Sequence, residues 1–464
     1  MKIKTISRSG DDYVPTSNEQ TSKTPRNLNP ALHPFERARE YTRALTATKL
    51  ERLFAQPFVG QLGSGHRDGI YSISTNMGTT NQIATALGDG IIKYWNLTDR
   101  DNELLSVKAH YGMVGGLCVI PGRQNMLSCG DDKTIKLWLV NVNKFGENVT
   151  DHNDEQLYKS QGLEKTFLGD HAFKGIDHHY TEGLFVTGGA LIQLWDMNRS
   201  KHISDLNWGY DNLNTVKFNK TETNIVASSG GSDNLIILYD IRTNSAVQKV
   251  VTNHRTNCLS WNPIEAFNFA SGSEDHNAYL WDMRKLDSLL NVYKDHVLGV
   301  MDVDFSPTGQ ELVTGSYDKT IRIFNSRSGH SREIYHTKRM QHVFVAKFTM
   351  DSKYIISGSD DTNVRIWRAQ AHDRASVKLA KQRTKMEYDD ALKEKYKHMP
   401  EIKRIARHRH VPKVVKKAQE IKRVELESIK RREDNQRRHR KPGAVPYVAE
   451  RKKHVRGIAL KEDK

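Results

Sequence analysis

Basic side chains recur every few residues near the end of the chain, at a spacing that suits contact with successive phosphate groups. The strongest candidates are Lys403, Arg404, Arg407, Arg409, Lys416, Lys417, Lys422, Arg423, Arg431, Arg432, Arg437 and Arg438. Such residues bind phosphates by displacing counterions, so the affinity falls steeply as salt rises. Few aromatic residues lie among them, so neither base stacking nor sequence-specific recognition is expected. The clusters therefore predict contact with RNA, and the alternative interpretation is a solvated nuclear or nucleolar localisation signal.

The sequence lacks the motifs that usually carry catalysis or hold a cofactor. It contains no Walker loop, nucleophile elbow, His-Glu-x-x-His pair or Rossmann fingerprint. Cys118, Cys129 and Cys258 are not spaced as zinc ligands or as a disulfide framework. We therefore expect a protein without enzymatic activity, cofactor, metal ion or small-molecule substrate.

Polar residues of four types also recur at fixed spacing through the middle of the chain. In the clearest copy, from His254 to Arg284, a His precedes a Ser, an Asp and a Trp, with short β-prone runs between turn residues. This spacing resembles that of WD repeats, in which the four side chains form a hydrogen-bonded chain that satisfies a buried indole and a buried carboxylate. Complete sets are predicted in three copies: His66, Thr85, Asp89 and Trp95; His110, Ser128, Asp132 and Trp138; His254, Ser271, Asp275 and Trp281.

Four further copies lack one or more members of the set. The third copy lacks the turn Asp, the fourth keeps Asp233 but ends in Tyr239, the sixth ends in Phe324 and the seventh has no His. Seven units of about 40 residues predict an all-β fold, a seven-bladed WD-repeat β-propeller with four-stranded antiparallel blades. Because a closed ring needs a strand that joins its ends, we expect Pro57–Leu62 to form the outer strand of the last blade.

The charge is unevenly distributed along the chain and indicates where the propeller ends. The formal net charge is +16, and residues 368–464 alone carry 31 basic and 14 acidic side chains. We therefore divide the chain into an N-terminal extended segment and helix over residues 1–54, the propeller over residues 55–367, and a basic helical or disordered tail over residues 368–464.

Helix-forming residues predict three helices outside the repeats. They cover Phe35–Phe54, with Pro34 at the first helical position, Ser376–Met399 and Lys413–Arg440. The first helix is interpreted either as packing beside the propeller or as binding a partner. The two basic tail helices, the last of which has only a narrow apolar stripe, are expected to become ordered on a partner. No apolar stretch approaches the roughly 20 residues of a membrane span, so we expect a soluble intracellular protein.

One short motif points to a protein partner. Trp281, Asp282 and Arg284 form a W-D-x-R box, and Tyr239–Arg242 is a weaker variant. The box resembles the site at which some WD-repeat proteins dock onto the adaptor of cullin-four ubiquitin ligases. Trp-Asp is also simply the end of a WD repeat, so an Arg two residues later often occurs by chance.

Several long stretches together resemble one family. They include RNLNPALHPFERAREYTRALTATKLERLF near the start, WNPIEAFNFASGSEDHNAYLWDMR within the repeats and HMPEIKRIARHRHVPKVVKKAQEI in the tail. Together they resemble the suppressor-of-fibrillarin family of WD-repeat proteins, over nearly the whole chain.

The resemblance implies a non-catalytic ribosome biogenesis factor of the nucleus and nucleolus. Members of that family belong to the small-subunit processome and act in pre-18S rRNA processing and 40S subunit assembly. The implied partners are pre-rRNA and box C/D small nucleolar RNA, bound through the basic tail, and processome proteins, bound through the propeller and the arms. Animal relatives are also described as substrate receptors of cullin-four RING ubiquitin ligases, which is the alternative function.

Overall fold

A computed structural model describes residues 29–140, 162–206, 208, 212–232, 234–373, 379–441 and 443–460. The predicted extended segment before residue 29 and the turn residue Asp233 lie outside the described residues. The chain divides into two compact units. The propeller unit comprises Phe58–Ala369 and Val411–Lys464, and the helical unit comprises Met1–Pro57 and Gln370–His410.

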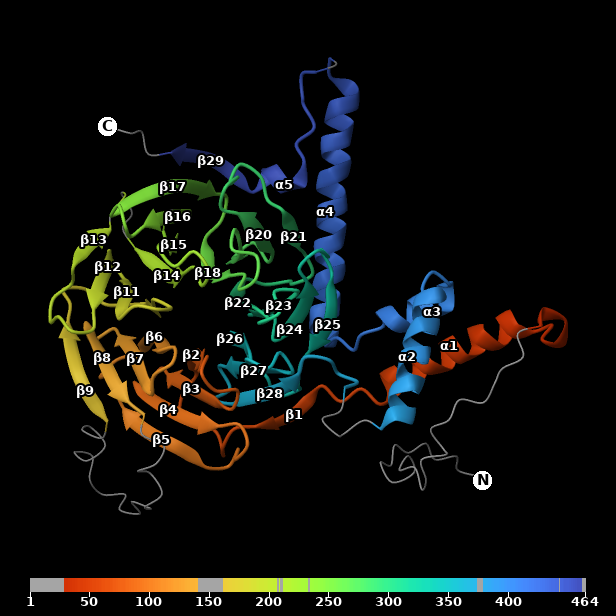
Figure 1. Ribbon diagram of the computed structural model, residues 1–464. Coiled ribbons are helices and arrows are strands. Elements are labelled where there is room, and N and C mark those ends of the chain that lie inside the picture. The colour runs from red at the N-terminus through yellow and green to blue at the C-terminus, as the bar shows by residue number, and fades with distance from the viewer. Residues whose placement is uncertain are drawn as a thin grey trace. The chain divides into compact units, whose positions relative to one another are not determined.

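The propeller unit contains seven antiparallel sheets arranged around a centre, which confirms the predicted seven-bladed propeller (Figure 1). Blade 1 is β2 (Ile70–Thr75), β3 (Gln82–Leu87), β4 (Ile91–Asn96) and β5 (Glu103–Lys108). Blade 2 is β6 (Val114–Val119), β7 (Asn125–Gly130), β8 (Thr134–Leu139) and β9 (Leu163–Leu168). Blade 3 is β10 (Gly175–His178), β11 (Leu184–Gly188), β12 (Ile192–Asp196) and β13 (Ser204–Leu206).

The remaining blades follow in the same order, and the first strand of each blade is the innermost. Blade 4 is β14 (Leu213–Phe218), β15 (Ile225–Gly230), β16 (Leu235–Asp240), β17 (Ser245–Thr252) and β29 (Val455–Leu460). Blade 5 is β18 (Thr256–Trp261), β19 (Asn268–Ser273), β20 (Ala278–Asp282) and β21 (Asn291–Tyr293). Blade 6 is β22 (Val300–Phe305), β23 (Glu311–Ser316), β24 (Ile321–Asn325) and β25 (Ser331–Tyr335). Blade 7 is β26 (Val343–Phe348), β27 (Tyr354–Ser359), β28 (Val364–Arg368) and β1 (Phe58–Gln61).

The turn Asp of the repeats has a local role in the hairpin between the second and third strands. Asp89, Asp132 and Asp318 each accept a hydrogen bond from the backbone N–H two residues later, at 3.0–3.1 Å. The residue after each Asp has a positive φ, as at Gly90 (88°) and Lys133 (62°). Because a carboxylate that bonds the backbone two residues on stabilises such a turn, the Asp shapes the hairpin independently of the rest of its set.

Apolar side chains between neighbouring blades form the core of the propeller. The largest side chains that are almost completely buried are Trp95, Trp138, Trp195, Trp281 and Trp367. The middle strands β7, β19 and β27 are buried at every position after the first, so both faces of each blade are covered. A single blade would leave these faces in water, and the blades are therefore stable only as a closed ring.

An N-terminal strand closes the ring. β1 pairs antiparallel with β28, with Phe58 opposite Trp367 and Gln61 opposite Arg365. The ring of Phe58 lies edge-on to Trp367, with 5.5 Å between the ring centroids. The prediction that Pro57–Leu62 supplies the outer strand of the last blade is confirmed.

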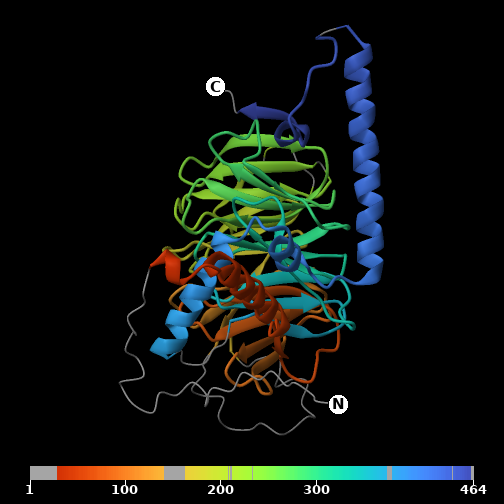
Figure 2. The same cartoon turned by 90° about the vertical axis from the view of Figure 1, so that its right-hand side faces the viewer.

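The end of the tail belongs to the propeller unit, which the sequence did not predict. The long helix α4 (Lys413–His439) runs beside the blades (Figure 2), and Lys422 on it donates a hydrogen bond to the carbonyl of His296 at 2.8 Å. A short helix α5 (Glu450–Lys453) follows, and β29 then pairs antiparallel with β17. The prediction of a helix over Lys413–Arg440 is confirmed, but the assignment of the last residues to helix or disorder was wrong.

The helical unit is built from both ends of the chain. It contains a 3-10 helix η3 (Pro30–Leu32), α1 (Glu36–Leu53), α2 (Ala380–Lys395) and α3 (Pro400–Arg407). Ala44 of α1, Leu392 of α2 and Ile402 of α3 form its buried apolar cluster. Lys393 pairs with Glu51 at 2.8 Å across α1 and α2.

Two predictions about these helices need correction. The first helix begins at Glu36, so Pro34 precedes it and is not its first residue. The first predicted tail helix, α2, does not need a partner molecule to cover its apolar side, because its buried Leu392 packs with Ala44 of α1 and Ile402 of α3 in the same chain. The apolar residues of these three helices form a small core only when the helices associate. Neither end of the chain alone therefore indicated the helical unit.

Candidate functional site

The polar set of blade 2 forms a continuous hydrogen-bonded chain. His110 Nε2 lies 2.8 Å from Ser128 Oγ, and His110 Nδ1 lies 2.9 Å from Asp132. Trp138 Nε1 donates to the same Ser128 oxygen at 2.9 Å. Burial lowers the pKa of His110 against the opposing pull of Asp132. The four side chains are thus satisfied inside the blade, and their chemistry is structural.

Blade 6 contains the same chain with one member replaced. His296 lies 2.9 Å from Asp318 and 2.6 Å from Thr314, while Phe324 occupies the position of the Trp and offers no N–H. Burial acts to raise the pKa of Asp318, but His296 and Arg322 outweigh it and hold that pKa well below its usual range. A phenyl ring therefore keeps the packing while the His and the Asp remain paired.

The set predicted for blade 1 is incomplete, and the expectation for His66 was wrong. Trp95 donates to Thr85 at 3.0 Å, but neither ring nitrogen of His66 has a hydrogen bond within the described part of the chain. The backbone N–H of His66 bonds to the carbonyl of Thr362, and its ring lies edge-on to Trp95 with 5.6 Å between centroids. Burial and the nearby Lys93 ammonium lower the pKa of His66 to about 4. The ring is thus a neutral packing group.

The set predicted for blade 5 also needs correction. Trp281 donates to Ser271 at 2.8 Å as expected, but His254 is exposed and does not join them. Tyr279 donates its hydroxyl to Asp275 instead. Tyr279 stands two residues before the Trp, where blades 1 and 2 have Lys93 and Lys136, and this aromatic residue is the one sequence signal that blade 5 differs.

A histidine from the tail occupies the vacant place in blade 5. His454 is 4% exposed and stacks on Tyr279 with 3.8 Å between ring centroids. Its Nδ1 lies 3.6 Å from Asp275. Burial lowers the pKa of His454 to about 4, with Asp275 opposing and His254 adding to the shift. The tail segment is therefore fastened to the propeller both by β29 and by this inserted ring.

The candidate RNA-contact residues are divided between the two units. Lys403, Arg404 and Arg407 are exposed on α3 of the helical unit. In the propeller unit, the exposed basic residues of α4 among the candidates are Lys416, Lys417, Arg423, Arg431, Arg432 and Arg438. The predicted single basic arm is thus two basic surfaces.

Four of these residues form a stripe on α4. At about 100° per residue, Lys416, Arg423, Arg431 and Arg438 fall within a sector about 80° wide and span about 33 Å along the axis. The buried Val415 faces away from this sector. We call these four residues the basic stripe. The same sector also contains Glu420, Glu427 and Asp434, so its charge is mixed rather than purely basic. Each exposed lysine or arginine of the stripe can still meet a phosphate and add to the binding through counterion release.

Arg423 of the stripe lies 3.8 Å from Glu427, and Arg431 donates to the carbonyl of Glu427 at 3.4 Å, but both side chains remain exposed. Three other predicted contact residues are engaged more closely within the protein. Lys422 bonds to the carbonyl of His296, and burial lowers its pKa. Arg437 pairs with Asp434 at 2.5 Å and lies over the ring of Tyr447. Arg409 donates to the carbonyl of His408 at 3.0 Å. These side chains help to position α4, the segment after it and the end of α3, and are poorer candidates for RNA contact.

The W-D-x-R box presents one residue to solvent. Trp281 is fully buried, whereas the side chain of Arg284 is 61% exposed. Asp282 holds the guanidinium through two contacts, from Nε at 3.1 Å and from Nη2 at 3.0 Å, and this pairing lowers the pKa of Asp282. The guanidinium also covers the ring of Phe267, at 4.2 Å from its centroid. Arg284 is thus presented in a fixed orientation.

The described residues contain neither a metal-binding cluster nor a membrane-spanning helix. Across those ranges, no group of three or more His, Cys, Asp or Glu side chains is arranged to hold a metal ion. Among the described helices, none is long and apolar enough to cross a membrane.

The blades and their hydrogen-bonded sets define a WD-repeat β-propeller protein. The model of the WD domain, G-beta repeat, matches residues 58–96, 102–138, 246–282, 287–325 and 328–368. Blade 3 and the first three strands of blade 4, whose sets are the most degenerate, fall between these matches. The model of the Sof1-like domain matches residues 369–455, which include the tail helices and His454.

Whole-chain relatives are more specific than the fold. Protein SOF1 of Saccharomyces cerevisiae is 61% identical over 472 residues, covering 99% of this chain and 96% of that protein. DDB1- and CUL4-associated factor 13 of Xenopus laevis is 45% identical over 99% of this chain and 100% of that protein, and the Homo sapiens protein of the same name is 44% identical over 98% and 99%. The chain belongs to the Sof1 family of WD-repeat proteins.

Proposed function

We propose that the protein is a non-catalytic ribosome biogenesis factor, a WD-repeat scaffold of the small-subunit processome that acts in pre-18S rRNA processing and 40S subunit assembly. In this role it is a nuclear protein that works in the nucleolus with a box C/D small nucleolar ribonucleoprotein. The propeller and the helical unit contact processome proteins, and the basic surfaces of α3 and α4 contact pre-rRNA or small nucleolar RNA. Membership of the Sof1 family supports the scaffold role.

The observation that carries the RNA-binding part is the basic stripe. Lys416, Arg423, Arg431 and Arg438 are exposed and share one side of a helix whose opposite side is anchored to the propeller. Anchoring fixes the charges in space, so less ordering is required when phosphates bind. The stripe has no interleaved aromatic side chains, which favours recognition of the backbone rather than of a base sequence.

The test compares RNA binding of full-length variants over a range of salt concentrations. Changing the four stripe residues to Gln is expected to make the plot of log affinity against log salt shallower by about 3, since each phosphate contact contributes about 0.7–0.9 to the slope. A matched control changes four exposed propeller residues, Lys201, Lys285, Arg339 and Lys353, to Gln and lowers the net charge equally. Equal slopes for the two variants would refute a role for the stripe.

Identification of the bound RNA tests the wider proposal. Crosslinking the protein in cells and sequencing the attached RNA is expected to enrich the small nucleolar RNA or the 5′ part of the pre-rRNA. Enrichment of unrelated messenger RNA, with no pre-ribosomal sequence, would contradict the assignment to the processome.

A second function is favoured by one observation, the exposed and oriented Arg284. The names of the animal relatives associate them with DDB1 and CUL4. In this function the protein is a substrate receptor that binds DDB1 through Arg284. Arg284→Ala is then expected to abolish binding to purified DDB1 while RNA association persists. Arg242→Ala is the control, because Arg242 lies 3.9 Å from Asp240 in the weaker variant of the box. Unchanged DDB1 binding by Arg284→Ala would exclude this docking mode.

A further inference from the structure

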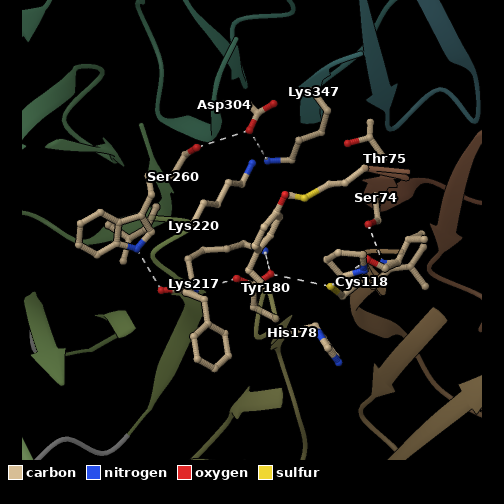
Figure 3. A pocket seen from close by; sticks show the side chains of 18 of the residues that line it. Ser74, Thr75, Cys118, His178, Tyr180, Lys217, Lys220, Ser260, Asp304 and Lys347 are labelled. Carbon is tan, nitrogen blue, oxygen red and sulfur yellow. Dashed lines mark hydrogen bonds and ion pairs between the residues drawn. The ribbon is translucent and has the colours of Figure 1, made fainter. Parts of the chain in front are cut away.

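The centre of the propeller contains a cavity of about 120 Å³ (Figure 3). Residues from the innermost strands β2, β6, β10, β14, β18, β22 and β26 line it, so all seven blades contribute. The lining residues lie at or near the carboxyl ends of these strands, which places the cavity toward one end of the central channel. A site at this place is held by the whole ring and is therefore rigid.

Three lysine side chains reach into the cavity, and two of them have carboxylate partners. Lys217 lies 3.2 Å from Asp177, and this carboxylate raises the pKa of Lys217 although burial acts to lower it. Lys347 lies 3.0 Å from Asp302 and 3.8 Å from Asp304. The backbone N–H groups of Phe218 and Phe348 occupy further oxygens of Asp177 and Asp304 at 2.8 and 3.0 Å.

Lys220 is the third lysine, and it has no ion pair or hydrogen bond within the part of the chain that the structure describes. Figure 3 shows its side chain pointing toward that of Lys347, among the residues that line the cavity. Lys220 is accessible to solvent at the cavity mouth, and the protein packed around its ammonium group, with the ammonium groups of Lys217 and Lys347, lowers its pKa against the pull of Asp304 and Asp177. The site therefore contains a positive charge whose nearest carboxylates are already bonded to other groups.

We propose that this cavity binds one anionic side chain, a carboxylate or a phosphate group, carried by an extended peptide segment of a protein partner, with Lys220 as its direct counterion. The size supports a single side chain, because pockets that enclose a whole small molecule are typically about 300 Å³ or larger. The apolar part of the lining supports a peptide rather than a free anion, since Leu259, Pro121 and Met77 can pack against a hydrocarbon stem. A charge-assisted hydrogen bond from an ammonium group would orient it.

The first test measures the reactivity of Lys220 itself in the full-length protein. A limiting amount of an amine-acetylating reagent is added, and acetylation of each lysine is quantified by mass spectrometry. An octapeptide of alternating Gly and Glu, or its phosphoserine counterpart, is expected to slow acetylation of Lys220 at least threefold and saturably. The Gly-Gln peptide is expected to have no effect, and acetylation of the exposed Lys285 is expected to stay constant. The more protective acidic peptide identifies the anionic group.

The proposal is overturned if neither acidic peptide protects Lys220. Protection by an octauridylate RNA but by neither peptide would assign the cavity to RNA, and equal protection by inorganic phosphate alone would assign it to a free anion. Both results contradict the peptide site.

The second test uses a variant and does not depend on acetylation. Lys220→Met is expected to weaken binding of the fluorescein-labelled acidic peptide at least tenfold while leaving RNA binding unchanged. Lys285→Met is the control, because it removes the same charge from the surface of blade 5. The basic tail is present in both variants, so any peptide that it binds contributes equally. Equal peptide affinity of the two variants would refute the role of Lys220.

Discussion

The inserted ring of His454 gives the most specific prediction about the architecture. In His454→Ala the buried imidazole is lost from its stack on Tyr279, where the ring centroids are 3.8 Å apart. The side chain is 4% exposed, so most of its apolar burial is removed. Burial and ring stacking together indicate a loss of roughly 2–3 kcal/mol in the free energy that docks the tail on blade 5.

Amide hydrogen exchange measures this loss where it occurs. β29 is the last strand of its sheet, so its amides should exchange when the tail segment detaches, without unfolding of the propeller. A loss of 2–3 kcal/mol corresponds to exchange about 30- to 150-fold faster over Val455–Leu460. The inner strand β18 is expected to exchange at its original rate, because the ring remains closed.

Two further variants separate packing from other effects. His454→Phe keeps an aromatic ring, and Nε2 of His454 has no hydrogen bond within the described residues, so exchange of β29 is expected to change less than threefold. His439→Ala changes an exposed histidine of α4 in the same tail and should have no effect. If β29 exchanges at the original rate in His454→Ala, the inserted ring does not fasten the tail and the reasoning fails.

The remaining predictions concern pH, the buried sets and the closing strand. Burial depresses the pKa of His454 to about 4, so docking of the tail is complete above pH 6.5. Docking weakens by up to about 3 kcal/mol as the pH falls from about 6.5 to about 4. Hydrogen exchange of β29 measured against pH tests this, and His454→Phe should remove the pH dependence. His110→Phe should lower the free energy of unfolding, measured by chemical denaturation, by about 2–4 kcal/mol, because Ser128 and Asp132 lose a buried partner. His66→Phe should lower it by less than about 1 kcal/mol, because the ring of His66 makes no hydrogen bond within the described residues. Equal losses in the two variants would contradict the hydrogen-bond geometry. Deletion of residues 55–62 should leave blade 7 with an open edge and give aggregated protein in size-exclusion chromatography, and a soluble product that melts cooperatively would contradict ring closure by β1.

The propeller could be predicted from the sequence because its signals are local and repeated. Six of the seven hairpins have a turn Asp and all seven have an aromatic strand end, so the repeats could be aligned even where the fourth ends in Tyr239 and the sixth in Phe324. Closure by Pro57–Leu62 followed from topology, since a ring of repeats needs one strand from the other end of the chain.

The contacts made by the tail could not be predicted in the same way. His454 and Asp275 meet across almost the whole second half of the chain, and nothing periodic links them. His254 stands at the expected place in the sequence, so the local pattern favoured the wrong histidine. The helical unit was missed for a related reason, because its core needs Ala44 from one end of the chain and Leu392 from the other.

The residues that line the cavity could not be predicted from the repeat pattern. Lys217 and Lys220 lie in and just after β14 of blade 4, and Lys347 lies in β26 of blade 7, so each looks like an ordinary surface lysine in the sequence. Only closure of the ring brings Lys347 to the other two. By contrast, the basic residues of α4 were visible as a cluster, and the structure added which of them share one side of the helix.

Closure by β1 also sets the order of events during synthesis. Phe58 leaves the ribosome long before its partner Trp367, and translation at about 5–20 residues per second separates the two by roughly 15–60 s. During this interval β1 has no β28 to pair with, while the early blades are already able to form. Its short length and Gly60 make it a poor template for other strands. The ring of the nascent chain therefore stays open until the seventh blade is complete.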